Sequence, residues 1–157
     1  MLSVFATLAA RCLAIALFLP FSALDKILNS KQAIAQAEEA VSPRSLATIL
    51  LMVGFALEIV MSVAILSGIA DRLAAFILAG YCIITALLWK RFWKVPDFRL
   101  RGESRGRETF WDFLKNLALA GGFLLLAFGT NSVGAQRFFD YPFASSYPYS
   151  TVDREIR

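Results

Sequence analysis

One carboxylate, Glu58, stands near the middle of an almost uninterrupted apolar stretch that covers residues 46–70. About 20 apolar residues match the ~30 Å hydrocarbon thickness of a bilayer, because an α-helix rises ~1.5 Å per residue. An ionisable group at the centre of such a helix costs at least ~2.5 kcal/mol on insertion into the membrane. Glu58 therefore requires a partner, a cavity or a proton.

A basic residue, Arg11, lies in the preceding apolar run, residues 4–24. If the two runs form an antiparallel hairpin with inner ends near Leu24 and Leu46, facing residues have numbers that sum to about 70, which puts Arg11 level with Glu58. Three interpretations follow. The two charges form a pair that only fixes how the helices meet, or Glu58 binds a small headgroup or carries a proton, or Arg11 extends to the near membrane interface instead.

Further charged and amide side chains gather at the predicted ends of the apolar runs. The first run ends at Asp25 and Lys26, and the fourth begins with Asp112, Lys115 and Asn116. In a chain that crosses the membrane four times these positions share one side, and Asp112 and Lys115 can pair at a spacing of three residues. Such a rim can hold a quinone head, or it can be ordinary solvation at the membrane interface.

Composition disfavours several kinds of chemistry. The chain has 157 residues and no histidine, the commonest general base and a frequent haem or zinc ligand, so we expect no metal site. Its two cysteines, Cys12 and Cys82, lie far apart in separate apolar runs, which indicates neither a redox pair nor a disulfide framework. With 58% hydrophobic residues and a mean hydropathy of +0.61, a net charge of +4 indicates lipid headgroups rather than nucleic acid as the partner.

The elements that must position these residues are membrane helices. Residues 30–41 are mostly good helix formers and predict a short interfacial helix after the first span. Gly68 and Asp71 predict a tight hairpin between the second and third spans. We expect an all-α membrane protein, a four-transmembrane-helix bundle in a single integral membrane domain, with an irregular aromatic-rich tail at 131–157. The expected spans are about 4–24, 46–69, 72–89 and 110–130.

Three segments of the chain carry a recognisable pattern. The first is Arg11 followed by an apolar run into FSALDKI, and the second is Glu58 followed by SGIADR. The third is FLKNLALAGGFLLLAFG, with Lys115 and Asn116 near its start. This pattern, which covers about residues 11–129, resembles the DoxX family of small bacterial membrane proteins, which includes relatives of the membrane subunit of thiosulfate:quinone oxidoreductase.

The chain departs from that family at several positions. Ala23 stands where the family often has a glycine, and residues 60–62 replace the glycines usually seen just after the glutamate. The histidine often found near the end of the third helix is absent, with Trp89 and Lys90 in that region. Chemistry borrowed from histidine-bearing relatives therefore does not transfer to this chain.

The resemblance implies a four-helix bundle associated with redox or respiratory complexes, oxidative-stress assemblies or quinone pools. We expect an accessory or subunit-type membrane protein without catalytic activity of its own, which stabilises or anchors such a complex and has other membrane subunits or a second copy as partners. The alternative is a quinone-binding redox protein that uses Arg11 and Glu58 and takes electrons from a partner chain. A small transporter is a further alternative. We expect no intrinsic cofactor, and a quinone or a bound lipid is the candidate ligand.

Charge distribution also predicts the orientation. Eight of the sixteen basic residues fall within residues 90–115, which together with the 25–45 connection lies on one side of a four-span chain. The positive-inside rule places both long loops in the cytoplasm and both termini outside. The expected location is the bacterial inner membrane.

Overall fold

Helices make up all the regular structure in residues 1–146 and Tyr149, which the computed structural model describes. Four stretches are long and apolar enough to cross a membrane: Leu2–Leu28, Arg44–Ser67, Asp71–Lys94 and Arg105–Phe128. This confirms the predicted all-α, four-span bundle, and the chain is a multi-pass membrane protein. The elements in order are α1 (Leu2–Ile15), η1 (Leu17–Ser22), α2 (Ala23–Leu28), α3 (Ser30–Glu38), α4 (Arg44–Ser67), α5 (Asp71–Trp89), η2 (Phe92–Lys94), α6 (Arg105–Phe128) and α7 (Ser132–Asp140).

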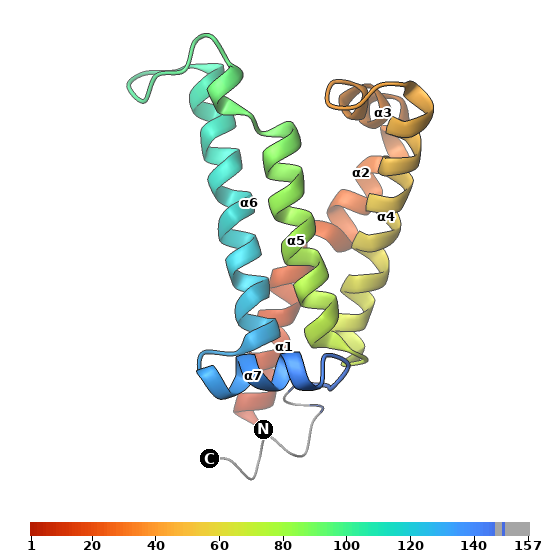
Figure 1. Cartoon of the computed structure of the whole chain (residues 1–157), viewed down its shortest axis with the longest axis vertical. Coiled ribbons are helices and arrows are strands. Elements are labelled where there is room, and N and C mark those ends of the chain that lie inside the picture. The colour runs from red at the N-terminus through yellow and green to blue at the C-terminus, as the bar shows by residue number, and fades with distance from the viewer. Residues whose placement is uncertain (147–148, 150–157) are drawn as a thin grey trace.

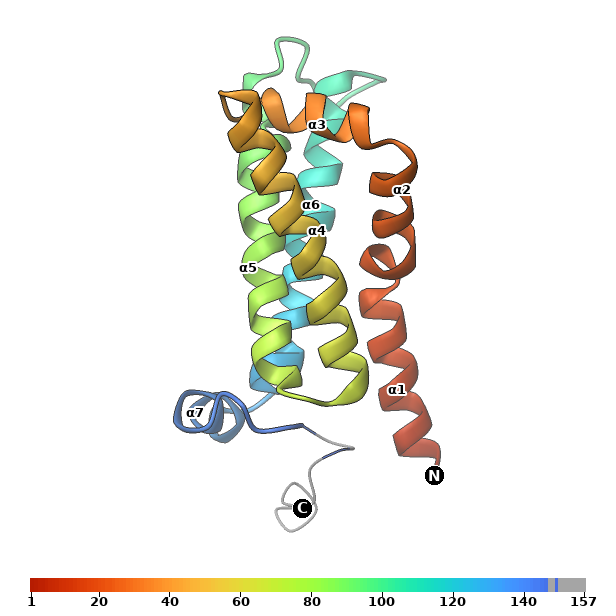
Figure 2. The same cartoon turned by 90° about the vertical axis from the view of Figure 1, so that its right-hand side faces the viewer.

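The spans run alternately up and down, so the two ends of the bundle differ (Figure 1). One end, which we call the loop face, carries α3 and the 95–104 connection. The other, the terminal face, carries the N-terminus, the turn between α4 and α5, and α7. The short helix predicted after the first span is α3, which lies crosswise over the loop end of the bundle (Figure 2).

The first span is broken in its middle, between α1 and α2. Leu19 has a non-helical backbone (φ −124°, ψ 108°) directly before Pro20. Proline has no N–H to donate to the helix, and its ring forces the preceding residue toward extended conformations. The break offsets α2 from α1 (Figure 2), and α2 packs against α4 and α3. Arg11 on α1 and Lys26 on α2 therefore lie on helices whose axes differ.

The turn between α4 and α5 is the predicted tight hairpin. Gly68 ends α4 in the left-handed region (φ 76°), where a residue with a Cβ is strained. A Cβ at Gly68 would also overlap the ring of Tyr149. Asp71, which we expected to cap the third span, is instead the first residue of α5, and Ala70 occupies the N-cap position.

Small residues allow the interior of the bundle to pack closely. Ala75, Ala79 and Ala127 are almost fully buried, and α5 and α6 lie side by side along most of their length (Figure 1). Larger core side chains, among them Phe18 and Phe123, fill the space between these helices and η1. The outer faces keep large apolar side chains exposed, as helices surrounded by lipid do.

The tail was predicted to be irregular from residue 131 onward, and for α7 this is wrong. Asn131 caps α7, since its side-chain oxygen accepts a hydrogen bond from the Gly134 N–H at 2.7 Å. Phe138 is 4% exposed, and its ring packs against those of Phe76 and Phe128. Burial of an aromatic side chain and an asparagine cap stabilise a nine-residue helix that lies across the terminal face (Figure 1).

The fourth span begins earlier than predicted, at Arg105 instead of residue 110. Ser104 accepts a hydrogen bond from the Arg107 N–H, and Asp97 accepts from the N–H groups of Arg105 and Gly106. These side chains satisfy N–H groups that a helix start leaves without partners. Asn116 is therefore halfway along α6 and not near its end.

Candidate functional site

The buried partner of Glu58 is Lys26. The Lys26 ammonium lies 2.5 Å from both carboxylate oxygens, and the Glu58 residue is 2% exposed. The predicted Arg11–Glu58 pair is thus wrong, although Glu58 does have a basic partner. Matching the depth of Cα atoms ignored the direction of the side chains, which on a helix tilt toward its N-terminus.

Two hydroxyl groups complete the surroundings of the Glu58 carboxylate. Ser22 donates to Oε2 at 2.9 Å and accepts from Lys26 at 2.8 Å, and Tyr81 donates to Oε1 at 2.7 Å. Tyr81 can lie across α4 because the neighbouring residue is Gly54, where a Cβ would come within 3.1 Å of the phenol oxygen. These hydrogen bonds and the ammonium replace water around a carboxylate placed inside a membrane span.

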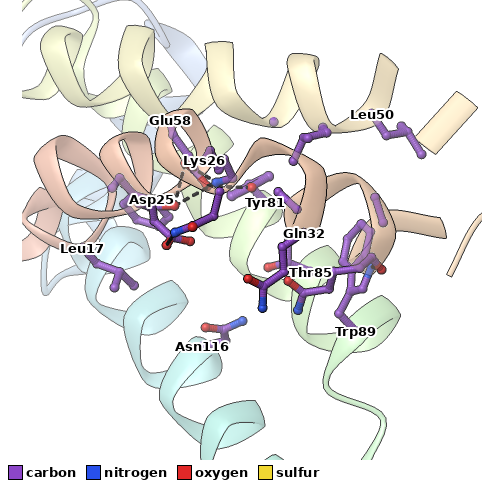
Figure 3. A pocket seen from close by; sticks show the side chains of 18 of the residues that line it. Leu17, Asp25, Lys26, Gln32, Leu50, Glu58, Tyr81, Thr85, Trp89 and Asn116 are labelled. Atoms are coloured by element: carbon purple, nitrogen blue, oxygen red, sulfur yellow. Dashed lines mark hydrogen bonds and ion pairs between the residues drawn. The ribbon is translucent and has the colours of Figure 1, made fainter. Parts of the chain in front are cut away.

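This polar centre borders a cavity of about 440 Å³ between the loop-face halves of the helices. Asp25, Gln32, Thr85 and Asn116 add polar groups to its wall, and Figure 3 shows them together with Lys26 and Glu58. Apolar surface comes from side chains such as Phe18, Leu51 and Trp89. A cavity with apolar walls and a few polar groups is the usual form of a small-molecule site.

Of the seven residues predicted for the site, four line this cavity: Asp25, Lys26, Glu58 and Asn116. Asp112 instead accepts hydrogen bonds from Lys115 at 3.2 Å and from Lys90 at 3.5 Å. That group is largely exposed, with 43% of the Asp112 side chain and 74% of the Lys115 side chain accessible. Asp112 and Lys115 thus form a surface ion pair at the edge of the bundle.

The seventh residue, Arg11, belongs to a separate buried centre near the terminal face. Its guanidinium lies 2.7 Å from the Asp71 carboxylate and donates to the Ile65 carbonyl at 2.7 Å, with both charged side chains at most 1% exposed. Arg11 therefore lies toward the terminal face in a buried ion pair, which is not the position at the membrane interface that the third interpretation describes. Asp71 at the start of α5 supplies the countercharge that the sequence analysis had assigned to Glu58.

The tail closes this second centre. Ser146 donates from its backbone N–H to one Asp71 oxygen at 2.9 Å and from its hydroxyl to the other at 2.7 Å, and it also accepts from Arg11. Ser145 donates to the Gly68 carbonyl at 2.6 Å, and the ring of Tyr149 lies 5.0 Å from the Arg11 guanidinium carbon. Ser145, Ser146 and Tyr149 thus connect the first span to the α4–α5 turn, whereas residues 147–148 and 150–157 of the predicted tail lie outside the described part of the chain.

Sequence reasoning missed four members of the two centres, namely Ser22, Tyr81, Asp71 and Ser146. Ser22 precedes Lys26 by one helical turn, and Tyr81 carries a hydroxyl group within an apolar run. Both positions gave only a weak indication in the sequence of a polar site. Ser146 gave none, because its contact with Asp71 joins residues 75 positions apart.

Metal ligands do not cluster in the described part of the chain, where no group of three or more His, Cys, Asp or Glu side chains could hold an ion. Cys12 is exposed, Cys82 is buried, and both are free thiols.

A family model of DoxX proteins matches residues 6–91 of the chain. The matched segment runs from α1 to the end of α5 and includes Arg11, Lys26, Glu58 and Asp71. Comparison with curated proteins and with solved structures gave no match.

Proposed function

The chain belongs to the DoxX family, and from this premise we propose that it binds the head of a quinone in the cavity beside Lys26 and Glu58, as a subunit of a membrane redox assembly. The observation that supports this most is the direct exposure of an intramembrane lysine–glutamate–tyrosine centre to a cavity of about 440 Å³. A charge pair that served only to join two helices would need no such space beside it.

The groups at this centre suit the chemistry of a quinone. The Lys26 ammonium and the Tyr81 hydroxyl, which donate to Glu58, can donate to a carbonyl oxygen in exchange for one of these bonds, and the Glu58 carboxylate is then an acceptor for the hydroxyl of the reduced form. Reduction of a quinone to a quinol consumes two electrons and two protons. The two protons come from water at the loop face and pass through Lys26 and Glu58, and a partner chain supplies the electrons.

Access from the lipid supports a membrane-dissolved ligand. Leu17 lines the cavity and is also 52% exposed on the outer surface of the bundle. The cavity therefore reaches the lipid-facing side next to the break in the first span. A molecule with a polar head and an apolar tail can place its head at Lys26 and leave its tail in the bilayer.

A binding measurement tests this proposal. The full chain in lipid nanodiscs is titrated with a short-chain benzoquinone, and we expect saturable binding that weakens at least about tenfold in Glu58→Gln and in Lys26→Met. Glu38→Gln is the matched control, because Glu38 forms an exposed pair with Arg44 outside the cavity. Equal affinity in the wild type and both site variants would refute the proposal.

A second candidate is the accessory role without redox chemistry. Gly121 and Gly122 lie exposed on α6, and a Cβ at either would meet no atom within 4 Å among the described residues. Their own bundle thus does not require them to be glycine, whereas close contact with a helix of another chain would. Gly122→Leu should then remove a partner that co-purifies from native membranes and leave quinone binding unchanged.

A further inference from the structure

Resting on the proposed function, we infer that Asn116 forms a second hydrogen-bonding subsite across the cavity from Lys26 and Glu58. The cavity then takes a ring that carries oxygen atoms at two opposite positions, such as a para-quinone or its hydroquinone, and holds both oxygen atoms at once. A ligand with a single polar head would use only one of the two subsites.

The position of Asn116 is the first observation. It stands halfway along α6, after the turn that holds Asp112 and Lys115 and before the apolar half of a span that is long enough to cross the membrane. An amide placed there without a hydrogen-bond partner has a substantial free-energy cost, because lipid cannot replace water as a donor or acceptor. A leucine at this position would avoid that cost.

The surroundings of Asn116 are the second observation. Its half-buried side chain lines the cavity, and Figure 3 shows the amide pointing from α6 into the space below Asp25 and Lys26. Within residues 1–146 and Tyr149, no hydrogen bond satisfies this amide. A molecule that occupies the cavity can therefore be its hydrogen-bond partner.

The opposite wall is built differently. Lys26 and Glu58 come from α2 and α4, and Tyr81 from α5, whereas Asn116 is the lining residue that α6 contributes among those described. Polar groups therefore stand on two sides of the same space, with apolar surface from Phe18 and Trp89 also in its wall. A flat ring with a polar group at each end satisfies both sides.

Asn116 also fits both redox forms of such a ring. Its amide can donate to a carbonyl oxygen through N–H and accept from a hydroxyl through C=O. The other subsite has the same double capacity, since Lys26 and Tyr81 donate and Glu58 accepts. At that subsite a hydrogen bond to the ring oxygen replaces one that Lys26 or Tyr81 donates to Glu58.

The test compares ligands that differ by one oxygen. Wild-type protein in nanodiscs is titrated with an alkylated para-hydroquinone and with the phenol that lacks its second hydroxyl. We expect the hydroquinone to bind about three- to tenfold more tightly, as one added hydrogen bond implies. In Asn116→Leu this preference should disappear, because the hydroquinone falls to the affinity of the phenol.

Gln136→Leu is the matched control, since it replaces an exposed amide on α7 by the same side chain and should keep the preference. Asn116→Gln, which retains the amide, should keep part of the preference for the hydroquinone over the phenol. An equal affinity of the wild type for both ligands, or an unchanged preference in Asn116→Leu, overturns the inference. If Glu58→Gln then still weakens both ligands, the proposed function survives; if neither ligand binds to the wild type, the proposed function fails as well.

Discussion

Lys26 directs its ammonium back along α2 to lie 2.5 Å from both carboxylate oxygens of Glu58. The two residues come from helices that meet because the first span is broken before Pro20. Each charge is thereby balanced inside the span, and the pair still borders a cavity.

Removal of one partner should destabilise the bundle more than removal of both. Glu58→Leu leaves a buried ammonium without its countercharge, and we expect a loss of about 3–5 kcal/mol in the free energy of unfolding. The double variant Lys26→Met and Glu58→Leu should recover most of this loss. Reversible unfolding in mixed micelles measures both, and a double variant that is no more stable than Glu58→Leu would contradict the pairing.

Gly54 should contribute to ligand binding because Tyr81 lies against it. In Gly54→Val the added methyl groups displace the phenol from Glu58, so we expect weaker quinone binding, by about three- to tenfold for the loss of one hydrogen bond. Gly121→Val is the control, since open space surrounds Gly121 in the described structure. Titration of both variants with the same short-chain benzoquinone provides the comparison.

The tail should contribute to stability through Ser146. Ser146→Ala removes the hydroxyl that bonds to Asp71 and Arg11, and we expect a loss of about 1–3 kcal/mol, as for a hydrogen bond to a buried charge. Ser67→Ala should change stability by less than about 0.5 kcal/mol, because its hydroxyl is exposed and makes a local bond of 3.3 Å. Equal unfolding midpoints for the two variants would show that the tail contact is not formed in the membrane.

The orientation of the chain in the membrane can be tested by labelling single cysteines. In a variant with Cys12 and Cys82 replaced by alanine, single cysteines at Gly102 and at Phe143 mark the loop face and the terminal face. The positive-inside rule predicts that a membrane-impermeant maleimide labels position 143, and not position 102, from the outside of intact cells. The reverse pattern would mean that the long basic loop faces outward.

The fold could be predicted because hydropathy and helix-breaking residues act locally. Runs of apolar residues indicated four spans, and Gly68 indicated the hairpin between α4 and α5. The break at Pro20 was the local signal that the sequence analysis did not use. Its consequence, the offset of α2 that brings Lys26 to Glu58, depends on packing against α4 and cannot be deduced from hydropathy.

The candidate site could be predicted only in part, for a similar reason. Burial cost identified Glu58 and Arg11 as residues that need partners, and both have partners in the structure. Which partner each one has depends on the direction of a long side chain and, for Arg11, on a tail segment far away in the sequence. Ser146 and Asp71 are 75 positions apart, and their contact depends on how the helices pack together.

The central claim is that the Lys26–Glu58 centre binds a ligand, in addition to joining α2 to α4. Its most direct test is a titration of the stable double variant Lys26→Met and Glu58→Leu in nanodiscs with the short-chain benzoquinone. We expect a folded bundle that has lost saturable quinone binding. A double variant that binds the quinone as tightly as the wild type would contradict it and leave the pair with a structural role alone.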